Sequence, residues 1–392
     1  MCITIFTILL IIAIYPYVLY PILGLILVFI KRIFVKKTPL LNTELPEITL
    51  LITAYNEEQF VEDKIKNTLQ LEYPSDKLNV VWVTDGSTDN TPQIVKKYPQ
   101  FKLMHSSERN GKVHAMQRAV VEVTTSIIVF CDANTQLEND SLIHIANQFS
   151  DNSVGAVSGE KRVCSDLKDT AAPAGEGLYW KYESLIKQID SNLYTAVGAA
   201  GELFAIRKEL YEPVPNDTIL DDFLITLKIA GKGYRIAYEP KAAASEYGSA
   251  NVTEEMKRKI RIAAGSFQVL SRNPWLFNVF KNPILVFQFV SHKFMRWIVT
   301  PLLMVLLLPM NIVLLWYNSH NLFLWIVLIL QILFYLLSYT GYLIQGKSIR
   351  NKVLFVPYYF FMANLAQFKG LLRFFKGNTS VKWDRSERII KS

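Results

Sequence analysis

Residues 79–89, NVVWVTDGSTD, indicate the fold class of this chain of 392 residues. A short apolar run that ends in polar turn residues is typical of a strand buried on both faces of a parallel sheet. Three further runs have the same character, at 48–53, 101–106 and 126–132. Helical patterns lie between the runs, at about 57–70, 88–98, 110–122 and 139–149. This alternation predicts an α/β domain whose mostly parallel sheet is flanked by helices.

The predicted strands end in polar side chains. The sequence reads TAYNEE at 53–58, DGSTD at 85–89 and DAN at 132–134. Each segment alone is also a good turn before a helix N-cap. Ligands of parallel sheets bind beyond the carboxyl ends of the strands, however, so three acidic strand ends at one edge predict a shared binding site.

These residue types suit a nucleotide diphosphate, whose negative charge must be neutralised. A divalent cation, Mg²⁺ or Mn²⁺, held by carboxylate oxygens usually does this. Asp132, with Asn134 or a diphosphate oxygen beside it, is the natural ligand. Asp85 can accept a hydrogen bond from the base or ribose, and Tyr55 can pack against the base. Lys112 begins a helical pattern, where its ammonium either contacts the diphosphate or is solvated.

Two adjacent acids, Asp221 and Asp222, open an otherwise apolar helical pattern. Carboxylates in a first helical turn are favoured by the helix dipole, so capping is one explanation. The other is a general base at the floor of a pocket, which transfer to a sugar hydroxyl with inversion requires. In the basic run 257–261, Arg258 and Arg261 share a helix face, where they either hold phosphate or lie near lipid headgroups.

Apolar sequence is concentrated on either side of this domain. Residues 1–30 contain no charged side chain, and about 20 apolar residues suffice to cross a bilayer. Two uncharged stretches, 297–319 and 321–346, predict a helical hairpin. Basic residues follow both the first segment and the hairpin, which places the domain between them on the cytoplasmic side. Pro16 and Pro21 are expected to kink the first helix.

Two further segments are expected at the membrane surface. The stretch 271–296 carries Lys293 and Arg296 among aromatic residues. The uncharged stretch 353–368 is short and contains polar residues, which favours an interfacial or re-entrant segment, with a full crossing as the alternative. The sequence thus predicts a multi-pass cell-membrane protein with its catalytic domain in the cytoplasm. The expected segments are a transmembrane helix at 1–30, a linker at 31–47, a cytoplasmic domain at 48–270, an interface helix region at 271–296, a transmembrane hairpin at 297–346, an interfacial or re-entrant segment at 353–372 and a cytoplasmic tail at 373–392.

The net charge of +8 does not indicate a nucleic-acid partner. Many of the lysines and arginines flank hydrophobic segments, which is typical of residues that face anionic membrane lipid on the cytoplasmic side. The three cysteines, Cys2, Cys131 and Cys164, lie far apart without metal-ligand or redox spacing. This usage suits a domain in the reducing cytoplasm.

The order of these motifs resembles that of the family 2 inverting glycosyltransferases, over residues 48–270. TAYNEE, DGSTD, NGK at 110–112, DAN, and an acidic pair before a basic helix all occur in sequence. Within the family, the chain is similar to the membrane-integrated synthases of cellulose, chitin, hyaluronan and poly-N-acetylglucosamine. The resemblance implies a GT-A-type fold. It also implies transfer of a sugar from a nucleotide diphosphate sugar, expected to be UDP-linked, to a glycan or lipid-linked acceptor in cell-envelope or exopolysaccharide synthesis.

The resemblance also implies roles for individual residues. Asp85 falls at nucleotide binding and Asp132 at the metal–diphosphate site. Asp222 is implied as the catalytic base, with Asp221 beside it, because Leu220-Asp221-Asp222 stands where the family has Thr-Glu-Asp. The other positions implied to contact the nucleotide are Thr53, Tyr55, Glu57 and Lys112. Residues 198–201 fall in the segment that lines the acceptor site.

Two departures from the family pattern matter. Asn134 replaces the second Asp of the family's Asp-x-Asp, which puts the strength of metal binding in doubt. The family's Gln-x-x-Arg-Trp appears as RKIRI at 258–262, with neither Gln nor Trp. Since that Trp helps to hold the terminal acceptor sugar in the family, its absence puts processive polymerisation in doubt. The segment 382–385, KWDR, loosely resembles the family's gating element.

Two alternative functions remain at this point. One is the transfer of a single sugar to a polyprenyl phosphate, although such enzymes usually lack an N-terminal membrane helix before the catalytic domain. The other is a non-catalytic component of a polysaccharide export complex, against which the retained Asp85, Asp132 and Asp222 argue. Partners for export or assembly are compatible with either function.

Overall fold

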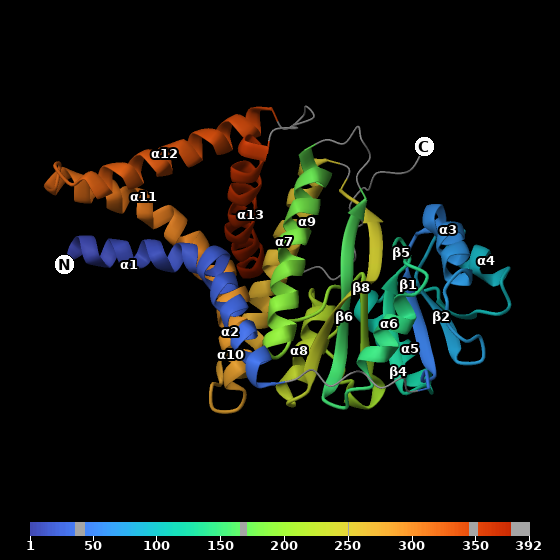
Figure 1. Cartoon of the computed structure of the whole chain (residues 1–392). Coiled ribbons are helices and arrows are strands. Elements are labelled where there is room, and N and C mark those ends of the chain that lie inside the picture. Colours follow the sequence, from blue (N-terminus) through green and yellow to red (C-terminus); the bar gives the residue numbers. More distant parts are fainter. Residues whose placement is uncertain (36–43, 165–170, 250, 345–351, 378–392) are drawn as a thin grey trace.

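The chain combines a central β-sheet with a group of long apolar helices that project from one side (Figure 1). The structure is a computed structural model that describes residues 1–35, 44–164, 171–249, 251–344 and 352–377. Among these residues, eight strands form one sheet in the order β3-β2-β1-β4-β7-β6-β8-β5. The strands are β1 Ile48–Ala54, β2 Leu78–Asp85, β3 Lys102–Ser106, β4 Ile127–Asp132, β5 Gln136–Leu137, β6 Val154–Cys164, β7 Leu203–Arg207 and β8 Arg235–Tyr247.

The four apolar runs of the sequence form the parallel part of the sheet. β3, β2, β1 and β4 lie side by side and parallel, which confirms the predicted fold class. β7 is antiparallel to both β4 and β6, and it joins this part to the parallel pair of β6 and β8. Every residue of β1 is buried, because helices cover both faces of the sheet.

Successive side chains of β1 enter two separate cores. Leu51 belongs to the core beneath α5 and α8, whereas Leu50 and Ile52 belong to the core beneath α3 and α6. The helices of the domain are α3 Glu58–Leu69, α4 Thr91–Lys96, α5 Lys112–Glu122, α6 Ser141–Gln148, α7 Ala171–Leu193, α8 Asp221–Gly231 and α9 Val252–Arg272. Short 3₁₀ turns occupy Lys208–Leu210 and Pro274–Phe277.

The second helix of the domain is shorter than the sequence pattern predicts. The expected span was 88–98, whereas α4 begins at Thr91. Asp89 is the reason, because its carboxylate accepts hydrogen bonds from the amides of Thr91 and Glu58, both at 3.0 Å. The turn after β2 is therefore tied to the start of α3, and the helix begins beyond it.

Three helices in the described residues are long and apolar enough to cross a membrane: Cys2–Phe34, Pro283–Tyr317 and Leu322–Leu343. The first consists of α1 Cys2–Ile14, the π-helix η1 Tyr15–Leu19 and α2 Tyr20–Phe34. The second consists of α10 Pro283–Phe289, the π-helix η4 Val290–Val299 and α11 Thr300–Tyr317, and the third is α12. Figure 1 shows that α1 and α2 differ in direction, with η1 and its Pro16 at the bend.

The expected segment at 353–372 lies within α13 Lys352–Phe375, which is not one of these three spans. α13 runs beside α9 in the body of the molecule (Figure 1), and it also contacts α12. The close approach to α9 depends on Gly370, because a Cβ at that position would collide with Ala263. The predicted interface region 271–296 instead runs directly into the second span, which begins at Pro283.

A buried cluster of charges joins the membrane helices to the domain. Glu183 of α7 accepts hydrogen bonds from His292 at 3.1 Å, from Lys293 and from Arg296 at 2.9 Å, all three on η4. Burial acts to raise the pKa of the Glu183 carboxyl, but these cations outweigh it and hold the pKa well below its usual value. Lys293 and Arg296 therefore pair with the protein itself, in addition to any contact with lipid.

We predict that Glu183→Gln destabilises the protein. The substitution leaves Lys293 and Arg296 buried without their counter-charge, which costs about 3–5 kcal/mol when one partner of a buried ion pair is removed. Thermal unfolding of the purified protein in detergent measures the effect. The matched control is Glu122→Gln, which removes an exposed pair with Lys102 and is expected to change stability little. Equal melting temperatures for the two variants would contradict the prediction.

Candidate active site

Most of the residues predicted from the sequence line one cavity of about 1200 Å³. Those that line it are Glu57, Lys112, Asp132, Asn134, Asp221, Asp222, Arg258 and Arg261. A small pocket shares Lys112 with the cavity and is lined by the remaining three, Thr53, Tyr55 and Asp85. The ends of β1, β2 and β4 therefore form one site, as their common edge in a parallel sheet requires.

Asp85 fixes the loop that leads to Lys112. One carboxylate oxygen accepts hydrogen bonds from the amides of Asn110 at 2.9 Å and Gly111 at 2.6 Å. The other oxygen is buried and has no hydrogen-bond partner among the described residues. Gly111 has a φ of 98°, a conformation that favours glycine. Asp85 thus holds this loop and keeps one acceptor oxygen for a ligand in the small pocket.

The Tyr55 ring has less free surface for a nucleotide base than the sequence suggests. The guanidinium of Arg109 lies 4.0 Å from the centre of the Tyr55 ring. One face of the ring is therefore already occupied by a cation, and a nucleotide base can reach only the other face or the edge. Thr53 and Glu57 are both buried at the end of β1, and the Glu57 amide donates to the Thr91 hydroxyl at 2.9 Å.

Lys112 lies between the acids of the site. Its ammonium donates to Asp132 at 2.7 Å, and both side chains are largely buried. Burial acts to lower the pKa of Lys112, but the negative charges of Asp132, Asp221 and Asp222 raise it overall. The ammonium consequently stays protonated, and it is available to bind an anionic ligand in the cavity.

The acidic pair stands in the first turn of α8. Burial, followed by the charge of Asp221, raises the pKa of Asp222 to about 7. Neither acid is the N-cap, since that position is Leu220 and has no capping side-chain hydrogen bond. One oxygen of Asp221 is also buried without a hydrogen-bond partner among the described residues. Capping alone therefore does not explain these two carboxylates.

The segment 198–201 lies against the acidic pair. Gly198 has a φ of 79°, and a Cβ there would collide with the Phe223 ring. At Gly201, a Cβ would lie 3.2 Å from a carboxylate oxygen of Asp222 and 3.5 Å from the Lys112 ammonium. Gly201 therefore leaves the space between the Asp222 carboxylate and the Lys112 ammonium open to a ligand.

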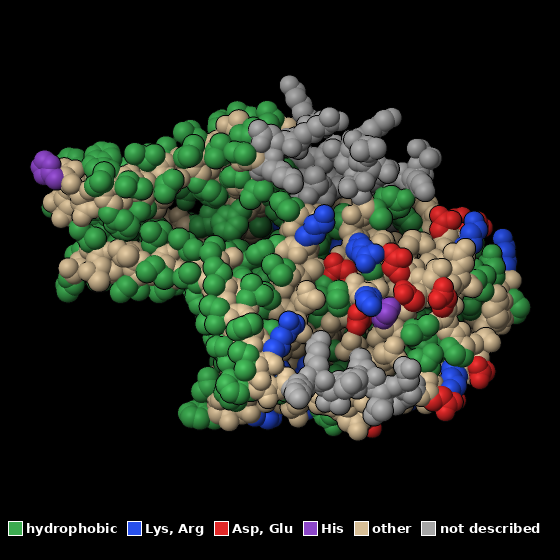
Figure 2. Space-filling view, viewed as in Figure 1, with side chains coloured by type: hydrophobic (Ala, Val, Ile, Leu, Met, Phe, Trp, Pro, Cys, Tyr) green, Lys and Arg blue, Asp and Glu red, His purple; other side chains and the backbone are tan. Residues whose placement is uncertain are grey.

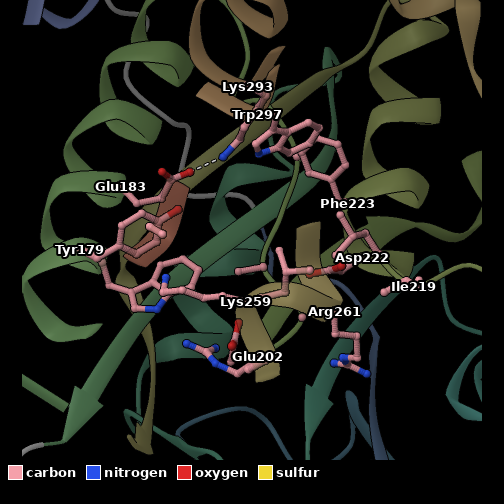
Figure 3. A pocket seen from close by; sticks show the side chains of 18 of the residues that line it. Tyr179, Glu183, Glu202, Ile219, Asp222, Phe223, Lys259, Arg261, Lys293 and Trp297 are labelled. Carbon is pink, nitrogen blue, oxygen red and sulfur yellow. Dashed lines mark hydrogen bonds and ion pairs between the residues drawn. The ribbon is translucent and has the colours of Figure 1, made fainter. Parts of the chain in front are cut away.

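The two arginines of α9 have different surroundings. Arg258 binds Glu255 at 3.0 Å, and Glu255 also accepts a hydrogen bond from Tyr359 of α13 at 3.0 Å. Arg261 has no such partner among the described residues, and burial lowers its pKa. Figure 3 shows Arg261 on the same side of the cavity as Asp222. Arg261 is thus the arginine available for a phosphate, whereas Arg258 pairs within α9 with Glu255, which contacts α13.

The residues present fit a divalent cation only if the substrate completes its coordination. The described residues contain no group of three or more His, Cys, Asp or Glu side chains that could hold a metal ion. Asp132 and Asn134 offer one carboxylate and one amide oxygen to the same cavity. Mg²⁺ is commonly bound by one or two carboxylates together with substrate phosphates, and this set is compatible with that arrangement.

Several residues that line the cavity belong to none of the sequence motifs described above. Trp297 of η4 packs on Phe223 with the ring centres 5.4 Å apart. Figure 3 shows Tyr179 and Glu183 of α7 across the cavity from Asp222. No local pattern in the sequence indicated them, because they reach the cavity from α7 and from the expected transmembrane hairpin at 297–346. The tail segment 382–385 lies outside the described residues.

Glu202 was missed as well. Its carboxylate lines the cavity and pairs with Lys161 at 2.5 Å, while Lys161 also pairs with Glu246. Burial acts to raise the pKa of Glu202, but Lys161 overcomes this and lowers it to about 2. A fixed negative charge therefore faces the cavity beside the segment 198–201.

Comparison with known proteins gives the class of this protein. Residues 49–214 match the sequence model of the family described as Glycosyl transferase family 2. The chain is 28% identical, over 286 residues, to the poly-beta-1,6-N-acetyl-D-glucosamine synthase of Staphylococcus aureus strain COL, which covers 69% of this chain and 68% of the relative. It is 27% identical over 238 residues to the synthase of that name from Staphylococcus epidermidis, covering 58% of this chain and 56% of the relative.

A solved structure shares the whole architecture. The mannosyltransferase PcManGT from Pyrobaculum calidifontis, in complex with GDP-Man and Mn²⁺, superposes with a TM-score of 0.68 at 23% identity and covers 98% of this chain and 100% of its own. This likeness concerns the fold. Together with the family match, it shows a GT-A-type glycosyltransferase domain joined to membrane helices. The chain thus carries a Glycosyl transferase family 2 domain at residues 49–214 and is a glycosyltransferase, with three helices that are long and apolar enough to cross a membrane.

We predict that the rate of sugar transfer rises with pH through about 7. A general base must be deprotonated, and the pKa of Asp222 is raised to about 7. Initial rates of nucleotide release with saturating donor and acceptor measure the profile between about pH 5 and about pH 9. Asp221→Asn removes a charge that raises the pKa of Asp222, so its midpoint should move to lower pH. A midpoint that stays in place in this variant would count against the assignment.

Proposed function

We propose that the protein transfers a sugar, with inversion, from a nucleotide diphosphate sugar to a glycan or lipid-linked acceptor at the cytoplasmic face of the membrane. The observation that carries this proposal is the half-buried Asp222, whose pKa is raised to about 7 and which lines the cavity together with Asp132 and Lys112. A base poised near the operating pH is the property that proton abstraction from a hydroxyl needs.

The donor is assigned to the end of the cavity nearest β1, β2 and β4. Asp85 would accept from the base or ribose, and the Lys112 ammonium and Arg261 guanidinium would bind the diphosphate. We assign a UDP-linked donor. The relatives from Staphylococcus, named as synthases of poly-beta-1,6-N-acetyl-D-glucosamine, support the setting of cell-envelope or exopolysaccharide synthesis.

The metal, Mg²⁺ or Mn²⁺, is assigned to Asp132 and Asn134. When bound, it supplies positive charge that stabilises the diphosphate leaving group. Lys112 already contacts Asp132 and would stand beside the same phosphates. The leaving group is thereby neutralised from more than one side, which suits the departure of a nucleoside diphosphate.

Asp222 is assigned as the base of the transfer. Its carboxylate would accept the proton of the acceptor hydroxyl while that oxygen bonds to the anomeric carbon of the donor sugar. The bond from the anomeric carbon to the diphosphate breaks on the opposite side, so the configuration at that carbon inverts. Asp221 raises the pKa of this base. Gly201 leaves room beside it for the reacting sugar.

We propose that the domain faces the cytoplasm. Basic residues follow the first membrane helix and the hairpin, an asymmetry that favours the cytoplasmic side. Nucleotide sugars are made in the cytoplasm, so this orientation gives the site its donor.

We predict that Asp222→Asn lowers kcat on the order of 10²–10⁴-fold. Asn keeps the shape of the side chain but cannot take a proton. Donor binding, measured by titration of the purified protein, should persist. The protein should be at least as stable as the wild type at about pH 8, because a buried charge is removed. Asp63→Asn, which alters an exposed carboxylate, is the matched control, and full transfer activity of Asp222→Asn in membranes would refute the role.

We predict that Asn134→Asp lowers the metal concentration needed for half-maximal activity by about tenfold, which corresponds to about 1.4 kcal/mol. A second carboxylate adds an anionic ligand for a hard cation. The readout is nucleotide release at increasing Mn²⁺ and Mg²⁺ in chelator-treated protein. Asn139→Asp, an exposed asparagine near the same strand, should leave the metal dependence unchanged. An unchanged dependence for Asn134→Asp would remove Asn134 from the metal site.

A further inference from the structure

The cavity has a second end, away from the donor site. Tyr17 of η1, Trp297 of η4 and Phe360 of α13 line it there. Tyr17 and Trp297 belong to two of the three helices that are apolar enough to cross a membrane. The space beside Asp222 is therefore continuous with a space bounded by membrane helices.

Beyond this end, the membrane helices pack on one another through apolar side chains. α1, α11 and α12 contain no charged residue and no histidine. Their shared core consists of Phe6, Leu303, Leu307, Leu314, Leu315, Leu324 and Val327. The side-chain contact between polar groups there joins Asn311 to Gln331 at 3.1 Å. A hydrophilic glycan has no polar path through a layer of this composition.

The cavity instead reaches the surface between α7 and α13. Leu178 of α7 and Val356 of α13 both line the cavity, and they are 40% and 44% exposed. Figure 2 shows hydrophobic side chains covering the projecting helices and the adjoining part of the body. A molecule that enters the cavity from this side would do so across an apolar surface beside the membrane helices.

The wall between this entrance and Asp222 is suited to sugars. The rings of Tyr179 and Tyr359 line it, and the Lys259 ammonium lies 4.6 Å from the centre of each ring, so one face of each ring is already covered by a cation. Gln367 of α13 also lines it. The amide oxygen of Gln367 is buried and has no hydrogen-bond partner among the described residues. Lys187 and Glu183 add charged groups to the same wall. Buried acceptors of this kind are satisfied by a ligand that donates hydrogen bonds, as a sugar hydroxyl does.

We infer that the acceptor is a glycolipid. Its glycan occupies the cavity between Gln367 and Asp222, and its apolar tail stays in the membrane and enters between α7 and α13 past Leu178 and Val356. This inference rests on the proposed function and selects the lipid-linked acceptor over a free glycan. The apolar core that α1, α11 and α12 share argues against the alternative in which this chain alone passes a polymer through its own membrane helices.

The test compares two acceptors that differ only in their tail. The hexadecyl and methyl β-glycosides of the donor's own sugar are offered to the full chain in vesicles of phosphatidylethanolamine and phosphatidylglycerol. We expect kcat/KM for the hexadecyl glycoside to exceed that for the methyl glycoside by at least about tenfold, because the tail is held where the cavity opens. A ratio of these two kcat/KM values near one in the wild type would overturn the inference.

Two substitutions locate the entrance. Leu178→Arg and Val356→Arg place a charge on the proposed path of the tail, so each should bring the ratio toward one. A partly unfolded sample lowers both rates equally and leaves the ratio as it is. Val121→Arg, at an apolar side chain that is 78% exposed on α5, is the matched control and should keep the wild-type ratio. An undiminished ratio in both entrance variants would overturn the proposed route.

The outcomes separate this inference from the function on which it rests. Nucleotide release with a ratio near one overturns the glycolipid and leaves the transferase intact. An absence of nucleotide release with every donor and either acceptor overturns both. Successive additions to the methyl glycoside, with no advantage for the tail, would identify a polymerising enzyme that takes a free glycan.

Discussion

The attachment of the membrane helices to the catalytic domain depends on two buried carboxylates of α7, Glu183 and Asp190. Glu183 binds Lys293 and Arg296 of η4, and about two turns further along α7, Asp190 accepts from His292 at 2.7 Å and from the Tyr20 hydroxyl. These contacts hold α7 against both of the membrane helices that enter the body. Since α7 is also a wall of the cavity, the shape of the acceptor side is set by charges that are costly to separate once buried.

The pKa values of the charged groups in the site are set by two opposing effects, burial and neighbouring charges. Burial disfavours the charged form of each group in the site, and neighbouring charges offset this effect to a different extent at each position. Glu202 is kept ionised by Lys161, whereas Asp222 has a neighbouring acid and is pushed toward its protonated form. Lys112 stays charged because it faces several acids. Two carboxylates in one cavity thus acquire different proton affinities, which is what distinguishes a base from a fixed charge.

The sequence indicated the cavity residues at the strand ends much better than those on the side of the membrane helices. Asp85 and Asp132 end apolar runs whose pattern is local, and parallel strands bring their carboxyl ends together in a regular way. Tyr17 and Trp297, by contrast, reach the cavity from distant membrane segments, and nothing near them in the chain indicates a partner. Gln367 appeared only as a polar interruption of an apolar stretch, because its meaning depends on the packing of α13 beside α9.

α9 has a consequence for the order of events at the membrane. Arg261 lies on its donor side, while Glu255, one and a half turns earlier, is held by Tyr359 of α13. A single rigid helix therefore contacts both halves of the reaction. A shift of this helix on nucleotide binding would also move the wall of the cavity that meets the acceptor. Linkage would then require acceptor binding to change the free energy of nucleotide binding by the same amount. Under the proposed assignment of donor and acceptor, α9 would couple the binding of the two substrates.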